Sequence, residues 1–122
     1  LLREARAREM KVLAVALLAT ALSWHPTPAR LGVSAQEFHL VLSRASVKAG
    51  VVEIELQNTG EDPHDLRLRK VGGHHTFTIP VTNPGARRTI AINMKPGRYR
   101  LWCSLADHRA LGMQTVLRVR RR

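Results

Sequence analysis

Apolar and polar residues alternate along most of the chain after Gln36, with the period of two that is typical of strands with one buried face. In one such stretch, Val52, Ile54 and Leu56 alternate with mostly polar neighbours. Turn-forming residues separate the stretches, and no helical periodicity is found after Gln36. The pattern predicts a β-sandwich, with strands at residues 38–42, 51–57, 64–69, 76–79, 90–94, 98–103 and 115–120 and a loop at residues 80–86.

The first 35 residues have a different pattern. An apolar run at residues 12–22 follows several basic residues, and it is shorter than the roughly 20 residues that span a bilayer. Such a run is typical of a secretory signal, and the small residues before Gln36 favour cleavage there. Ala29 is a second candidate cleavage position, and an amphipathic or buried N-terminal helix or an uncleaved anchor are the alternatives. We expect a leader at residues 1–35, a domain at 36–122, and export to the periplasm or the cell exterior.

The chain of 122 residues has a formal net charge of +11, and residues 36–122 hold 15 Lys and Arg against 7 Asp and Glu. This length predicts one domain. A basic surface attracts nucleic acids or acidic proteins, or is simply solvated. No helix-turn-helix or RNP-like pattern is present, and only 4% of the residues are aromatic. We therefore expect partners with acidic docking surfaces and no nucleic acid, and a monomer without stable membrane insertion of the mature domain.

Cys103 is the only cysteine, so the chain forms no internal disulfide. His108 follows five residues later and Met113 another five, while His64 comes directly after a turn at residues 58–63 upstream. A lone cysteine is usually an inert, buried residue. Two histidines, one cysteine and a distant methionine, however, form the ligand set of a blue-copper electron-transfer site. The combination therefore favours one copper ion that cycles between Cu(I) and Cu(II).

Residues 51–119 resemble a small cupredoxin of the plastocyanin, auracyanin and azurin kind. The matching motifs are Asn-x-Gly-x-x-Pro-His at residues 58–64 and Gly-x-Tyr-x-x-x-Cys at 97–103, followed by His108 and Gly112-Met113. One departure is Ala106-Asp107, where many relatives have Pro-Gly. The resemblance implies an all-β, Greek-key β-sandwich of the cupredoxin type after the N-terminal signal segment, with copper bound by His64, Cys103, His108 and Met113.

The resemblance also implies a function. It is similar to that of an exported mononuclear blue-copper protein, which carries single electrons between redox proteins and is not an enzyme. The electron would leave through the exposed edge of His108, inside an apolar rim of Leu105, Ala106, Ala110, Leu111 and Pro63. A copper-binding carrier or sensor without a shuttle role is the alternative. A thiol enzyme is disfavoured, because Cys103 lies on the inward face of a strand and no third orienting group is evident.

Neighbouring polar residues are candidates for tuning the site. By resemblance, Asn58 is expected to tie the two ligand loops together, and Ser104 could do the same. Asp65 follows His64 and either orients an imidazole or faces solvent. His74 and His75 are adjacent on an extended chain and therefore point to opposite faces, so we expect no second metal site there.

Overall fold

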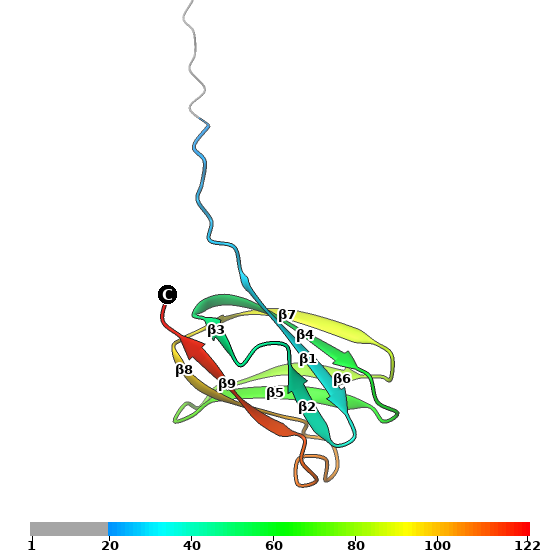
Figure 1. Cartoon of the computed structure of the whole chain (residues 1–122). Coiled ribbons are helices and arrows are strands. Elements are labelled where there is room, and N and C mark those ends of the chain that lie inside the picture. The colour runs from blue at the N-terminus through cyan, green and yellow to red at the C-terminus, as the bar shows by residue number, and fades with distance from the viewer. Residues whose placement is uncertain (1–19) are drawn as a thin grey trace, which may run out of the picture.

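The computed structural model describes residues 20–122 as a sandwich of two β-sheets (Figure 1). One sheet has the strand order β2-β1-β4-β7, and the other has the order β3-β9-β8-β5-β6. The all-β sandwich predicted from the alternating pattern is confirmed. The strands are β1 Ala29–Gln36, β2 His39–Leu42, β3 Ser46–Lys48, β4 Gly50–Asn58, β5 His64–Lys70, β6 Thr76–Thr82, β7 Arg87–Met94, β8 Gly97–Trp102 and β9 Gln114–Arg120.

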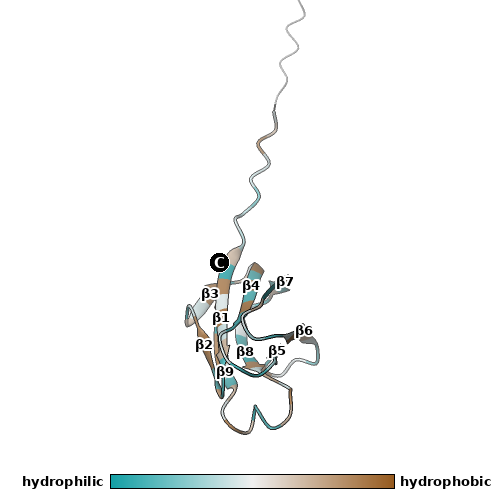
Figure 2. Cartoon of the chain, turned by 90° about the vertical axis from the view of Figure 1, so that its right-hand side faces the viewer, coloured by the Kyte–Doolittle hydropathy of each residue, from teal (hydrophilic) through white to brown (hydrophobic). Residues whose placement is uncertain are grey.

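The core lies between the sheets and is built by the alternation along each strand. In β4 the side chains of Val52, Ile54 and Leu56 are fully buried, and the residues between them are partly exposed. The teal and brown segments that follow one another along the strands in Figure 2 show the same alternation. Leu66 and Leu68 on β5 close the core from the other sheet. Burial of each such side chain contributes about 1.5–3 kcal/mol, so the alternation is the main source of stability.

Strand β1 belongs to this core. It pairs in parallel with β4, and Leu31, Val33 and Ala35 are at most 1% exposed. The sandwich therefore begins at Ala29, upstream of the domain boundary that we placed at Gln36. The small residues that suggested a cleavage site there belong to β1, where they alternate between inward and outward positions. Residues 1–19, which contain most of the expected leader, lie outside the described residues.

Two smaller differences concern the edges. β6 continues through Pro80, where we expected a loop to begin. It lies at the edge of its sheet, where a missing N–H removes no bond to a further strand. Phe38 is not an inward strand residue: it occupies the turn between β1 and β2 and is 36% exposed.

Residues 20–122 contain no helix long and apolar enough to cross a membrane.

The strand directions gather four connections at one end of the sandwich, which we call the loop end. It consists of residues 37–38, 58–63, 83–86 and 103–113. The pairings Ala35 with Asn58 and Trp102 with Gln114 place the first and last of these connections at matching strand ends. In Figure 1 the N-terminal stretch and the C-terminus leave the sandwich from the opposite end.

Candidate metal centre

Cys103 lies at the loop end because β8 delivers it there. Tyr99 and Leu101 lie on the inward face of β8, Cys103 directly follows the strand, and all three are buried as the sequence pattern predicted. The chain then loops through His108 and returns to β9 at Met113. The Cys103 N–H donates to the Met113 carbonyl at 3.1 Å, and the Met113 N–H donates to the His108 carbonyl at 3.0 Å. The loop is thus closed by its own backbone around the three candidate side chains.

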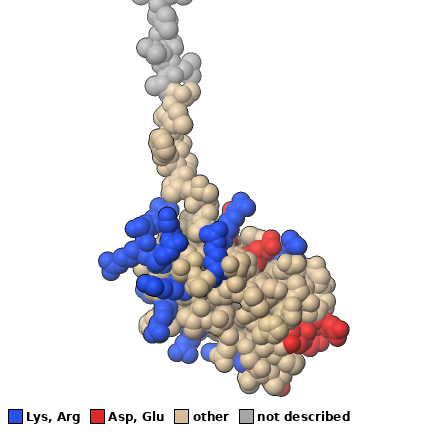
Figure 3. Space-filling model, in the orientation of Figure 1, with Lys and Arg blue, Asp and Glu red and all other residues tan. Residues whose placement is uncertain are grey.

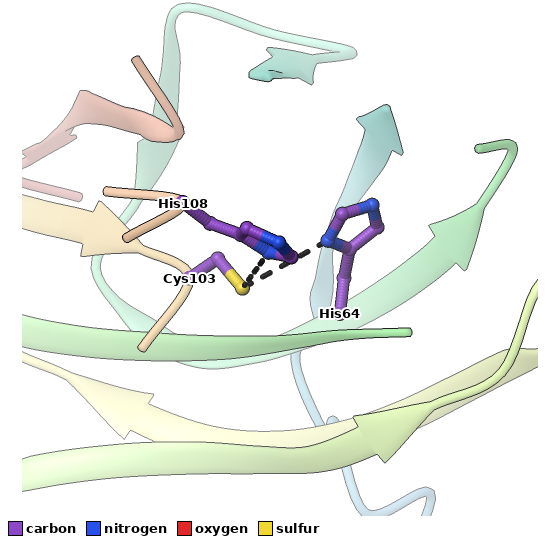
Figure 4. A group of neighbouring side chains, drawn as sticks. All are labelled: His64, Cys103 and His108. Carbon is purple, nitrogen blue, oxygen red and sulfur yellow. Dashed lines mark hydrogen bonds between the residues drawn. The ribbon is translucent and has the colours of Figure 1, made fainter. Parts of the chain in front are cut away.

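Three of the four candidate ligands meet side chain to side chain (Figure 4). The Cys103 Sγ lies 3.9 Å from Nδ1 of His64 and 3.7 Å from Nδ1 of His108. These donor atoms lie within 4.8 Å of one another. His64 and Cys103 are fully buried, and His108 is 9% exposed. Two imidazoles therefore present the same nitrogen to one buried thiol, from segments 39 residues apart.

Met113 is fully buried next to this cluster in the chain. Its position depends on Gly112, whose φ of +125° is in a region that residues with a side chain rarely adopt. A Cβ on Gly112 would also lie 2.8 Å from the Phe38 carbonyl oxygen. In the same loop Ala106 has a φ of 45°, so the chain makes a left-handed turn at the Ala106-Asp107 departure.

The electrostatics of Cys103 suit a metal ligand better than a catalytic nucleophile. Burial raises the pKa of the Cys103 thiol, and backbone hydrogen bonds offset only part of this shift. Reactive cysteines have a lowered pKa and partial exposure, and Cys103 has neither. A thiolate at this position would therefore need a cation beside it, and a bound metal ion supplies that charge.

Asp65 links the two ligand-bearing segments. Its carboxylate is 3% exposed and accepts hydrogen bonds from the Ser104 N–H at 2.6 Å and from the Ser104 hydroxyl. Arg67 Nε adds a longer contact of 3.4 Å. We expected Asp65 to orient an imidazole or to face solvent, and both expectations are wrong. Asp65 instead holds the start of β5 against the residue that follows Cys103.

Asn58 does not form the expected hydrogen bonds between the two ligand loops. Its Nδ2 donates to the carbonyls of Asp62 at 2.7 Å and Thr82 at 2.9 Å, and its Oδ1 accepts from the Gly60 N–H. These bonds shape the loop that leads to His64 and fasten it to the end of β6. None of them reaches the Cys103 loop, so the expected tie between ligand loops is made by Asp65 and Ser104.

Glu37 is a neighbour of the cluster that the sequence analysis missed. Its carboxylate accepts a hydrogen bond from Nε2 of His64 at 2.8 Å. It also accepts from the backbone N–H groups of Asp62 at 2.7 Å and Glu61 at 3.0 Å. These two backbone donors, with a smaller contribution from His64, lower the pKa of Glu37 to about 2. No motif marks this residue, because it lies in a turn 27 positions before its histidine.

The surface above His108 is partly apolar. The Phe38 ring packs on the His108 ring with centroids 5.2 Å apart, and Asp62 places a carboxylate oxygen 3.9 Å from Nε2 of His108. Phe38 thus joins the rim that we predicted around this histidine. Of the predicted rim residues, Leu105 is half-buried, and Pro63, Ala106, Ala110 and Leu111 are exposed. His74 and His75 are exposed and lie outside the cluster, as expected.

No family model matches the sequence, and no curated protein matches it significantly. Several solved structures share its fold. A dithionite-reduced auracyanin from Roseiflexus castenholzii has a TM-score of 0.61 and 17% identity, covering 77% of this chain and 98% of that one. Auracyanin A, a "blue" copper protein from Chloroflexus aurantiacus, has a TM-score of 0.61 and 17% identity, covering 76% and 99%. A purple cupredoxin from Nitrosopumilus maritimus has a TM-score of 0.53 and 18% identity, covering 72% and 97%.

These similarities show that the chain has the cupredoxin fold. The candidate metal centre adds a separate, chemical argument. Two imidazoles, a thiol and a thioether form the donor set of a type 1 copper site, in which a His2Cys group is completed by a weak methionine. The fold and the donor set together point to one copper ion.

Proposed function

We propose that this protein is a mononuclear blue-copper electron carrier, in which Nδ1 of His64, Sγ of Cys103 and Nδ1 of His108 bind copper and Met113 is the weak fourth ligand. The observation that carries the proposal is the convergence of two imidazole Nδ1 atoms on one buried thiol. The predicted ligand set rests on this geometry for three members and on the burial and loop position of Met113 for the fourth.

The donor set suits one-electron chemistry. Thiolate and thioether favour Cu(I), whereas imidazole suits Cu(II). The mixed donor set therefore fully suits neither oxidation state, and the bound ion would supply a one-electron redox couple. The protein's part is to hold the donors in place and to exclude water. The bonds between Asp65 and Ser104, and between the backbones of Cys103, His108 and Met113, hold the loop in one arrangement. A held site changes little between oxidation states, which favours fast transfer.

We propose that electrons enter and leave at His108, within the apolar rim that includes Phe38 and Leu111. Leu111 is 52% exposed and Phe38 36% exposed, so this rim offers apolar surface beside a candidate ligand. Small interfaces of this kind suit weak and brief redox encounters. The partners would be redox proteins with acidic surfaces, attracted at low salt by the net charge of +8 on residues 36–122. Electron transfer to such a partner should slow as salt is added.

The proposal places the domain outside the cytoplasm, as a monomer and without enzymatic activity. The features in its favour are the apolar run at residues 12–22 for export and the raised pKa of Cys103 against thiol catalysis. A copper carrier or sensor would use the same ligands. The two functions differ in kinetics: a shuttle has a reversible couple and fast electron self-exchange, whereas a carrier or sensor needs neither.

The first test is spectroscopic. Cu(II) added to the full chain should produce an intense visible thiolate-to-copper band and a narrow copper hyperfine splitting in EPR. Cys103→Ser should lose both signals, and His75→Ala, at an exposed histidine outside the cluster, should keep both. A colourless wild-type protein, or a weak signal unchanged by Cys103→Ser, would refute the proposed site. A copper band with slow self-exchange would favour the carrier or sensor.

A further inference from the structure

The contact between Glu37 and His64 has no counterpart at His108 with the same geometry. Nε2 of His64 is 2.8 Å from the Glu37 carboxylate, while Nδ1 of the same ring faces the Cys103 sulfur. His64 is fully buried, and the Glu37 side chain is 23% exposed. The buried ring is therefore held from its far side by one carboxylate that comes from another sheet.

The loop before His64 is shaped to receive this carboxylate. The N–H groups of Glu61 and Asp62 both point to it, at 3.0 and 2.7 Å. Gly60 lies so close that a Cβ at this position would collide with the Glu37 carboxylate. Two backbone donors and a glycine that leaves room for the carboxylate indicate a specific anion-binding position in the same loop that leads to His64.

The chemistry of this seat bears directly on the candidate metal centre. A ring that donates from Nε2 keeps a free lone pair on Nδ1, which is the form that binds a metal. A carboxylate partner also increases the basicity of a ligating imidazole, and loss of such a partner typically lowers metal affinity 10–100-fold. A negative charge near the ion stabilises Cu(II) more than Cu(I), because the oxidised ion carries the larger charge.

We propose that Glu37 is a positioning residue that selects the metal-binding form of His64 and lowers the reduction potential of the site. The inference rests on the proposed function, since it concerns one of the proposed copper ligands. It assigns to the turn between β1 and β2 a part in tuning the metal, although that turn carries none of the proposed ligands.

The test compares two substitutions that each remove one negative charge. Glu37→Gln keeps an oxygen that can accept from His64 and the backbone. Asp62→Asn removes a carboxylate that is 53% exposed and 3.9 Å from Nε2 of His108. In the copper-loaded full chain, Glu37→Gln should favour Cu(I) about tenfold, a rise in potential of about 59 mV for one electron. Asp62→Asn should shift the potential by less than half as much. Equal shifts, or no shift in Glu37→Gln, would overturn the tuning role.

A metal-free measurement keeps this inference separate from the proposed function. Nitrogen NMR of the full-length apoprotein at mildly alkaline pH should show His64 with its proton on Nε2. Glu37→Ala should give a mixture of both tautomers, with a melting curve to report whether the variant is folded. Glu37→Gln, which keeps an oxygen that accepts from Nε2, should retain the proton on Nε2. A wild-type ring with its proton on Nδ1 would overturn the positioning role, whether or not copper binds. A wild-type protein without the blue band would refute the proposed function instead.

Discussion

The two ends of the sandwich differ in charge and in what holds them together. At the loop end, the carboxylates of Glu37, Asp62 and Asp65 lie close to candidate ligands or to the residue after Cys103, and Asp107 is exposed in the Cys103 loop. At the opposite end, which we call the basic end, blue side chains dominate the view in Figure 3. Its members line two surface hollows, of about 570 and 530 Å³. The basic end consists of Arg44, Lys48, Arg98, Arg118, Arg120, Arg121 and Arg122.

The difference follows from what each end must do. The loop end contains long connections without strand pairing, and it buries polar groups. Its backbone is therefore held by side chains, namely Glu37, Asn58 and Asp65, and no buried side-chain polar atom is left without a partner among the described residues. At the basic end most of the charged side chains are exposed. Substitutions at the loop end should thus change stability and the metal site, whereas those at the basic end should change long-range attraction.

The largest expected effect, on folding itself, comes from removing β1, which runs between the two ends. A chain of residues 36–122 lacks nearly all of β1, including the buried Leu31 and Val33. Each costs about 1.5–3 kcal/mol, against a total stability of about 5–15 kcal/mol for a typical domain, and the pairing with β4 is lost as well. This chain should be unfolded by circular dichroism, while the control of residues 30–122 should melt cooperatively. A folded chain of residues 36–122 would contradict the assignment of β1 to the core.

A smaller effect is expected when the tie between ligand segments is cut. Asp65→Ala leaves the Ser104 N–H without its buried acceptor, which should lower the free energy of unfolding by about 1–3 kcal/mol. Arg121→Gln at the basic end should change it by less than about 0.5 kcal/mol, because the side chain is exposed. Urea unfolding of both apoproteins measures the difference. Similar losses in the two variants would show that the ends are not held differently.

The smallest effect is expected from the charges of the basic end on electron transfer at the loop end. The two ends lie about 25 Å apart, the length of a strand of eight residues. That distance exceeds the screening length of about 10 Å at 0.1 M salt. If electrons leave near His108 as proposed, electron transfer to the small anion hexacyanoferrate(III) should therefore speed up in Asp107→Asn. The rate of electron transfer to hexacyanoferrate(III) should fall less than about twofold when Arg118 and Arg121 are both changed to Gln. A larger effect of the arginines in stopped-flow experiments would mean that the basic end itself faces the oxidant.

Much of the fold could be predicted because the alternation of apolar and polar residues within each strand indicates which side chains are buried. The alternation in β4, β5, β8 and β9 is local, and it placed Leu56, Leu66, Leu101 and Leu117 correctly in the core. Pro80 was misplaced because the same local rule cannot tell an edge strand from a loop. β1 was misplaced because its small and apolar residues also fit the end of a signal segment.

The candidate site divides in the same way. Cys103, His108 and Met113 share one loop, so their spacing alone indicated that they could meet, and His64 was added by the motif before it. Glu37, Phe38 and the bond between Asp65 and Ser104 could not be found from spacing. These contacts join segments 27 to 70 positions apart, and the sheet order decides which connections share an end.

The sequence by itself thus determined the class of fold and the donor set, because periodicity and residue chemistry are local properties. The tertiary structure decided which residues surround those donors: a carboxylate behind His64, an aromatic ring against His108 and a buried aspartate beside Cys103. It also separated the charges into an acidic loop end and a basic end, which the net charge of the chain conceals. The physical reason is that pairing and packing bring together segments whose individual patterns contain no information about one another.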